Sequence, residues 1–122
     1  MKTNNFLFAQ KEERPWGIFY VLHDEAEYKV KRIEVNPRSR LSYQYHNKRA
    51  ETWVIVFGEA KVTLDDHKHI LKKGDTIIIP RLSKHRIENL LDSTLIFIEI
   101  QTGEYFGEDD IVRISDDYSR DK

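Results

Sequence analysis

The segment LSYQYHNKRAETWVIVFG, residues 41–58, has apolar and aromatic ends and a polar middle. An amide, an imidazole, a guanidinium and a carboxylate fall close together there, as Gln44, His46, Arg49 and Glu51. The ends are typical of β-strands, because aromatic and β-branched side chains pack well on a pleated surface. The segment therefore predicts two strands with a polar connection, whose four polar side chains either form a solvated face or point to one place.

Strand geometry limits how these side chains can meet. Gln44 and His46 are two residues apart, so on a strand both side chains leave the same face, with origins about 7 Å apart. Two bonds of about 2 Å to one ion could bridge that separation. Glu51 follows His46 at an odd offset and faces the same way only if the chain turns between them, which we predict at residues 47–49. Taken alone, a solvated strand face is the simpler interpretation of these residue types.

The remainder of the chain favours an all-β fold. Short segments rich in Val, Ile, Thr and aromatic residues end at turn residues, which is typical of strands. The predicted strands are residues 28–35, 52–58, 60–65, 75–80, 85–90 and 93–101. The connections NPRS, DDHK, KKGD and LLDS have turn composition, and only the acidic C-terminal end could form a turn or two of helix. We predict six to ten strands in a sandwich or closed barrel.

Composition excludes several classes of partner. The 122 residues, 39% of them apolar and 34% charged, with no cysteine, are typical of one ordinary globular domain. The net charge of −1 comes from interspersed charges, so we expect neither a nucleic-acid partner nor a membrane partner. No apolar stretch approaches about 18 residues, and the N-terminal segment has no signal-peptide core. The expected location is cytoplasmic.

A second polar pattern lies downstream, in GDTIIIPRLSKHRIEN, residues 74–89. A glycine, a proline, a histidine and an asparagine interrupt two predicted strands here, as Gly74, Pro80, His85 and Asn89. Alone, His85 is typical of a surface histidine.

Together the two segments resemble the paired motifs of the cupin superfamily. The first motif would comprise Gln44, His46, Glu51 and Gly58, and the second the four residues just named. The resemblance implies a double-stranded β-helix, also called a jelly-roll barrel. It further implies that Gln44, His46, Glu51 and His85 bind one divalent metal ion. The spacing and the second motif together favour this pocket over a solvated face.

Glutamine at the first ligand position narrows the resemblance. Gln-x-His-x-x-Arg-x-Glu-x-Trp, residues 44–53, is similar to the C-terminal cupin domain of type II mannose-6-phosphate isomerases, which is often fused to a GDP-mannose pyrophosphorylase. The similarity covers nearly the whole chain. Departures are Arg38 and Leu82, where the family tends to have glycine, and Lys48, where it often has a second histidine.

These observations predict a stand-alone single cupin domain over residues 1–122. We expect an N-terminal arm at residues 1–13, a core barrel at about 14–103 and an acidic C-terminal segment at 104–122. The pyrophosphorylase part does not occur in this sequence, so nucleotidyl transfer is not implied.

The implied ligand set suits Zn, Mn, Fe, Co or Ni. The resemblance implies an aldose–ketose isomerase that interconverts mannose 6-phosphate and fructose 6-phosphate in polysaccharide or GDP-mannose precursor supply. Such an enzyme needs a Lewis acid to stabilise the enediolate oxygens and an acid–base group to move the proton. Candidates for the acid–base group are Lys31, Arg49 and Tyr118.

A sugar phosphate as the small-molecule partner also needs a basic anchor. Arg49 is the first candidate because it lies between two predicted ligands, and the others are Arg14, Lys29, Lys31 and Arg113. Alternatives remain for each pattern: Arg49 could pair with Glu51, and KVKR (29–32) could be a solvated strand face. The acidic segment GEDDIVR (107–113) could likewise be solvated. Association into a homodimer through open sheet edges is expected.

Two other functions stay open. The domain could bind or sense a sugar phosphate without turnover, or it could be another cupin enzyme, such as a sugar epimerase or a dioxygenase. Trp16 and Trp53 are more typical of core packing than of sugar platforms. His67 and His69 share strand spacing but fall in the predicted DDHKH turn, so we predict no metal site there.

Overall fold

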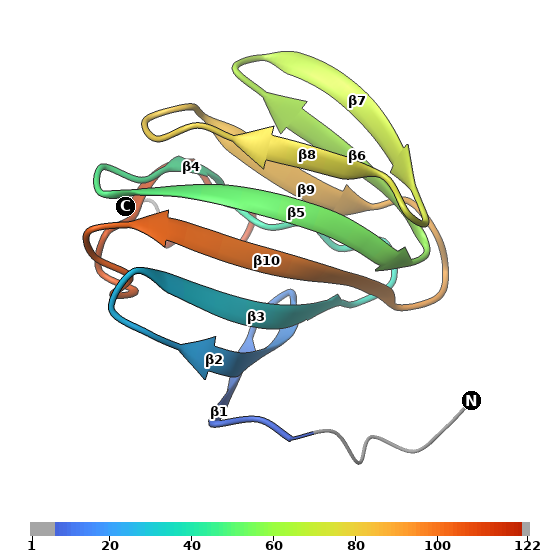
Figure 1. The fold of residues 1–122 in the computed structure, drawn as a ribbon. Coiled ribbons are helices and arrows are strands. Elements are labelled where there is room, and N and C mark those ends of the chain that lie inside the picture. The colour runs from blue at the N-terminus through green and yellow to red at the C-terminus, as the bar shows by residue number, and fades with distance from the viewer. Residues whose placement is uncertain (1–6, 121–122) are drawn as a thin grey trace.

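The computed structural model describes residues 7–120, which form two antiparallel β-sheets (Figure 1). The described strands are β1 (Gln10–Arg14), β2 (Gly17–Asp24), β3 (Tyr28–Val35), β4 (Tyr43–Tyr45), β5 (Arg49–Phe57), β6 (Glu59–Leu64), β7 (His67–Lys72), β8 (Thr76–Ile79), β9 (His85–Asn89), β10 (Leu95–Gly103) and β11 (Val112–Ser115). None of the described residues forms a helix long and apolar enough to cross a membrane.

The two sheets are built mostly from strands that are distant in sequence. One sheet has the order β1-β2-β3-β10-β5-β8 and the other β11-β4-β9-β6-β7. Figure 1 shows β10 between β3 and β5 at the centre of the larger sheet. This arrangement confirms the predicted all-β jelly-roll fold.

The interior has an apolar end and a polar end. Successive residues of a strand face opposite sides, so each strand contributes every second residue to the interior. One cross-strand row of the larger sheet is apolar and consists of Ile55, Phe97, Ile33 and Phe19. The next inward row along the strands consists of Trp53, Glu99 and Lys31, and the one after it of Glu51, Gln101 and Lys29. The polar rows are as buried as the apolar row, which makes them candidates for a site.

The predicted strands occur within a few residues of their expected positions, and β3 matches residues 28–35 fully. The first strand expected in residues 41–58 is present as the short β4, whereas β1, β2, β7 and β11 were missed. The described residues form eleven strands, which exceeds the predicted six to ten. The predicted DDHK turn is wrong at its second half, because only Asp65 and Asp66 take positive φ, 46° and 70°, as in a two-residue hairpin turn. His67 and His69 therefore lie on β7, where both are exposed.

Both termini depart from the expected outline. The N-terminal arm predicted for residues 1–13 lies partly outside the described residues, and residues 10–13 belong to β1, which pairs with β2. The helical turn considered for the C-terminal segment is wrong, because residues 112–115 form β11, which pairs with β4. The C-terminal segment is thereby tied to the smaller sheet.

Arg38 and Leu82, two of the departures from the family pattern, share an unusual backbone conformation. Their φ angles are 58° and 73°, in the left-handed region where glycine carries no side-chain penalty. Leu82 is 55% exposed, and its backbone N–H donates to the carbonyl oxygen of His46 at 3.0 Å. The chain keeps the turn that connects β8 to β9 and accepts about 1–2 kcal/mol of local strain.

Replacing Leu82 by glycine is expected to stabilise the domain. The substitution relieves the strain but adds freedom to the unfolded chain, so the net gain in unfolding free energy is about 0.5–1 kcal/mol. The matched control is Arg81→Gly, at an exposed neighbour with negative φ, which should lose about that amount. Urea unfolding measures both variants, and an equal loss in both would contradict the strain argument.

Candidate metal centre

Three strands and one bend bring the predicted ligands together at the polar end of the barrel. In the smaller sheet, Gln44 on β4 lies opposite both His85 on β9 and Arg113 on β11. His46 follows β4 directly, and Glu51 reaches the interior from β5 of the other sheet. The predicted turn between His46 and Glu51 is present as a bend at residues 47 and 48.

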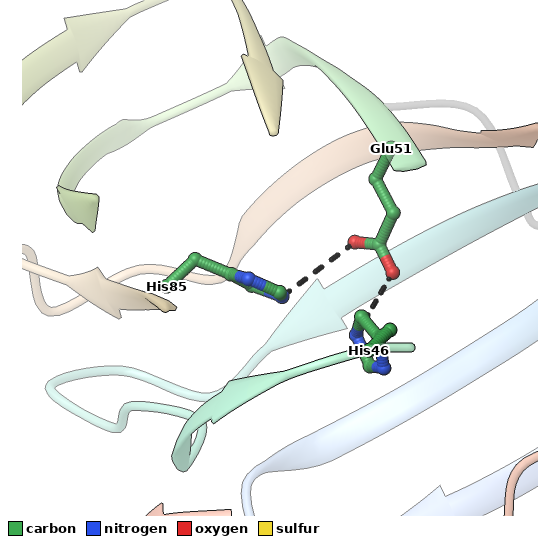
Figure 2. A group of neighbouring side chains, drawn as sticks. All are labelled: His46, Glu51 and His85. Carbon is green, nitrogen blue, oxygen red and sulfur yellow. Dashed lines mark ion pairs between the residues drawn. The ribbon is translucent and has the colours of Figure 1, made fainter. Parts of the chain in front are cut away.

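Figure 2 shows the carboxylate of Glu51 between the two imidazole rings. Glu51 Oε2 lies 3.1 Å from His46 Nε2, and Glu51 Oε1 lies 4.0 Å from His85 Nε2. The three possible ligand atoms all lie within 4.8 Å of one another. Each side chain is at most 3% exposed, so water is largely excluded from the group.

Backbone carbonyls orient both histidines. His46 Nδ1 lies 2.7 Å from the carbonyl oxygen of Asp110, and His85 Nδ1 lies 2.9 Å from that of Ser83. Because a carbonyl oxygen only accepts, each Nδ1 donates a proton and each Nε2 is turned toward Glu51. His85 Nε2 is buried and has no hydrogen-bond partner among the described residues. Metal-binding histidines commonly have this arrangement, in which one ring nitrogen donates to a fixed acceptor and the other has a free lone pair.

The charges of the cluster favour an ionised Glu51. Burial alone would raise the pKa of Glu51, but His46 and Arg49 hold that pKa well below its usual value. Burial would lower the pKa of His46, and the pairing with Glu51 outweighs it and raises that pKa. Burial lowers the pKa of His85 despite the nearby carboxylate, so its ring is neutral at pH 7.

Arg49 and Trp53 fix the carboxylate from the sides. Arg49 Nε donates to Glu51 Oε2 at 2.9 Å, and Trp53 Nε1 donates to Glu51 Oε1 at 2.9 Å. Arg49 is therefore a salt-bridge partner of Glu51, as one of the alternatives held, while it also lines the adjoining cavity. Trp16 and Trp53 belong to the hydrophobic core, which confirms that expectation.

Gln44 lies beside the cluster with its amide toward His46. Its Nε2 is 3.3 Å from His46 Nε2, while Ser42 Oγ donates to its Oε1. A half-turn of the amide would direct Oε1 toward the histidines and let Nε2 donate to Ser42 Oγ. Gln44 can thus supply a neutral oxygen ligand, which stays a prediction.

A cationic cavity adjoins the cluster. Its charged lining consists of Arg14, Lys31, Arg49, Glu99, Glu108, Arg113 and Arg120, and Gln44 connects it to the ligand group. The predicted anchors Arg14, Arg49 and Arg113 therefore come together there. Lys29 is buried on β3 but is not among the residues that line this cavity, and neither is Tyr118, which packs against the hydrophobic core.

The interpretation of KVKR as a solvated face is wrong, and that of GEDDIVR holds for the exposed Glu108 and Asp109 but fails at Asp110. In KVKR, Lys29 and Lys31 are buried and face the barrel interior. In GEDDIVR, Asp110 is buried, and its carboxylate accepts hydrogen bonds from the backbone N–H groups of Asn47 and Lys48 at 3.0 and 2.9 Å. The C-terminal segment therefore forms one wall of the site and holds His46 in place.

Glu99 is a site residue that the sequence interpretation missed. It is buried on β10 and accepts hydrogen bonds from Trp53 Nε1 at 3.1 Å and Gln101 Nε2 at 2.7 Å. Burial and the charge of Glu51 raise the pKa of Glu99 to about 7 against the opposing charge of Lys31. The available signal was its position in the strand, because Glu99 lies two residues after Phe97 and therefore shares its inward face.

An antiparallel jelly-roll barrel with a His-His-Glu cluster at one end defines a cupin domain. The Cnp3 cupin domain of Schizosaccharomyces pombe has this fold, with a TM-score of 0.70 and 16% sequence identity over 81% of this chain and 69% of that one. The chain belongs to the family described as mannose-6-phosphate isomerase C-terminal, whose model matches residues 2–116. The resemblance found in the sequence is thereby confirmed.

Two relatives place the domain within larger proteins. The chain is 44% identical to the alginate biosynthesis protein AlgA of Pseudomonas aeruginosa and 45% identical to the mannose-1-phosphate guanylyltransferase of Salmonella montevideo, in each case over 88% of its length. It spans only 22% and 23% of those proteins. The shared part is the cupin domain.

Glu99 should make the stability of the metal-free domain depend on pH. Its pKa rises from the usual 4.5 to about 7 in the fold. The contribution of Glu99 to the unfolding free energy is therefore complete below pH 4.5, where its carboxyl is protonated, and is lost as pH rises through 7. Glu99→Gln stays neutral throughout. Relative to wild type, its unfolding free energy should therefore gain about 1–3 kcal/mol between pH 5 and pH 8.5. Urea unfolding at both pH values, with chelator present, measures this, and parallel pH profiles would contradict it.

Proposed function

We propose that the domain binds one divalent metal ion through His46, Glu51 and His85, with Gln44 as the fourth ligand. Two imidazoles, one carboxylate and one amide oxygen suit Zn, Mn, Fe, Co or Ni. The unpartnered His85 Nε2 is the observation that carries this proposal. With one anionic ligand, a bound divalent ion keeps a net charge of about +1 and polarises a sugar carbonyl or hydroxyl as a Lewis acid.

We propose that the reaction is the interconversion of mannose 6-phosphate and fructose 6-phosphate. The support is the cationic cavity directly beside the cluster, because a sugar phosphate has a carbonyl at one end and a dianion at the other. The family to which the chain belongs is described by this activity. A role in supplying precursors for polysaccharides agrees with the names of the relatives, an alginate biosynthesis protein and a mannose-1-phosphate guanylyltransferase.

The three acid–base candidates differ in their surroundings. Arg49 is held by Glu51, and Tyr118 lies outside the lining of the cavity. Lys31 lines the cavity, where its ammonium group pairs with Glu108. The buried carboxyl of Glu99 lies in the same lining, between Trp53 and Lys31 in the strand register. We therefore expect Glu99 and Lys31, more than Tyr118, to influence turnover.

A second candidate is a domain that binds a sugar phosphate without turning it over. The observation in its favour is that the relatives carry names of guanylyltransferase and biosynthesis proteins, of which this domain is less than a quarter. We also propose that the domain forms a homodimer and is located in the cytoplasm.

His85→Gln should weaken metal binding strongly. Loss of a ligand is expected to raise the dissociation constant for Zn²⁺ or Co²⁺ at least about 100-fold, since loss of a supporting residue alone costs 10–100-fold. The matched control is His69→Gln on the edge strand β7, an exposed histidine outside the cluster and two strands away from β9, which should bind like wild type. Isothermal titration of the chelator-stripped proteins measures both, and a wild type without one-to-one binding would contradict the site.

The activity proposal predicts ketose formation from mannose 6-phosphate. The metal-loaded domain should produce fructose 6-phosphate in a coupled assay, and Glu51→Gln should lose at least about 100-fold in kcat/KM, because both the ligand charge and the Arg49 pair are lost. Saturable binding of mannose 6-phosphate without turnover, with each of Zn, Mn, Co and Ni, would replace the isomerase by the binding function.

A further inference from the structure

Lys31 carries a buried positive charge inside the barrel. Its side chain is 4% exposed, and its ammonium nitrogen lies 4.0 Å from the centre of the Phe19 ring. An ammonium group removed from water in this way is unfavourable unless an anion accompanies it. Lys31 therefore requires a negative partner at the wall of the cavity.

That partner comes from the C-terminal segment. Glu108 Oε2 lies 2.6 Å from Lys31 Nζ, and the Glu108 side chain is 40% exposed. Glu108 belongs to a turn and not to a strand, so its carboxylate enters the cavity wall from a connection between strands. Partial burial would raise the pKa of Glu108, but the charges of Lys31 and Arg49 lower it, so the carboxylate is ionised at pH 7.

The turn is anchored two residues later, independently of Glu108. Asp110 binds the bend at residues 47 and 48 through its carboxylate and His46 through its carbonyl oxygen. The Glu108 side chain can therefore leave Lys31 while the support of His46 stays in place.

The same cavity has more positive than negative groups. Lys31 and four arginines line it, against the two carboxyl groups of Glu99 and Glu108. Three of these arginines have carboxylate partners outside the lining, as the pairs Arg14–Glu12, Arg49–Glu51 and Arg120–Asp116. Arg113 Nε, a donor that always carries a proton, is buried without a hydrogen-bond partner among the described residues. Arg113 is thus the arginine of the lining that has no carboxylate partner among the described residues, and its buried, unpaired donor indicates a missing anion.

We propose that Glu108 occupies the anion subsite of this cavity and that the phosphate group of a sugar phosphate displaces it from Lys31, with Arg113 as a further donor. This inference rests on the proposed sugar-phosphate function and adds how the anion is bound. A dianion replaces a monoanion, so the exchange keeps Lys31 paired and gives Arg113 an acceptor. Lys31 is then the anchor of the phosphate and not the base.

The strand register supports the position of the subsite. Arg113 on β11 is the direct cross-strand partner of Gln44, the proposed fourth ligand. The anion would thus be held on the strand next to the ligand group, so that one small molecule could contact both. A neutral sugar has no phosphate group to compete with the Glu108 carboxylate for Lys31. The exchange would therefore favour phosphorylated substrates.

The test measures binding and needs no turnover. Inorganic phosphate, mannose 6-phosphate and mannose are titrated into metal-free wild type and Glu108→Gln, with folding checked by circular dichroism. Glu108→Gln should bind both phosphates about tenfold more tightly, because the ligand no longer displaces a charged carboxylate. Mannose should show no such gain. The matched control is Asp109→Asn, with the same change of net charge at a neighbour that accepts a hydrogen bond from Tyr105 Oη and does not line the cavity.

A second substitution separates exchange from a general charge effect. In Lys31→Met, phosphate binding should weaken about tenfold or more, and adding Glu108→Gln to it should restore almost nothing. Equal tightening by Glu108→Gln and Asp109→Asn, or unchanged phosphate binding in Glu108→Gln, would overturn the inference. Tighter phosphate binding in a protein without isomerase activity would leave the inference standing and remove the proposed reaction.

Discussion

The buried carboxylate of Glu51 is the interaction on which the rest of the site depends. It lies within hydrogen-bond or ion-pair distance of His46, Arg49 and Trp53, and 4.0 Å from His85. A carboxylate taken out of water is strongly unfavourable unless it is paired, so its surroundings must supply positive charge and donors. Arg49 supplies a permanent charge, and the two histidines supply groups that either a proton or a metal ion can occupy. The need to pair this carboxylate therefore gathers groups that could hold a metal ion.

The C-terminal segment converts this cluster into an ordered site with a cavity. Asp110 fixes the bend after His46 through its carboxylate and orients the imidazole through its carbonyl group. Glu108 compensates Lys31 on the neighbouring wall, and Arg113 faces the same cavity from β11. The polar end of the barrel thus receives Glu108, Asp110 and Arg113 from the C-terminal segment. The apolar end provides the hydrophobic packing.

The local patterns explain how much could be predicted. The strand at residues 28–35 was predicted with its full bounds because apolar and charged residues alternate there. The convergence of His46, Glu51 and His85 was predicted because their spacing matches a known pair of motifs. Lys29 and Lys31 were misjudged because alternation tells which residues share a face but not which face is inside. Glu99, Glu108 and Asp110 were missed or taken as solvated because their partners are set by the return of distant strands. No local sequence pattern indicates that the acidic segment will contact His46 through Asp110.

X-ray absorption spectroscopy of the zinc-loaded domain tests the central claim most directly. The account predicts a first shell of nitrogen and oxygen atoms at about 2.0–2.2 Å with the multiple-scattering signature of two imidazole rings. His85→Gln should reduce that signature to one ring. A zinc shell with no imidazole or one imidazole in the wild type would contradict the claim that His46, Glu51 and His85 converge on one ion.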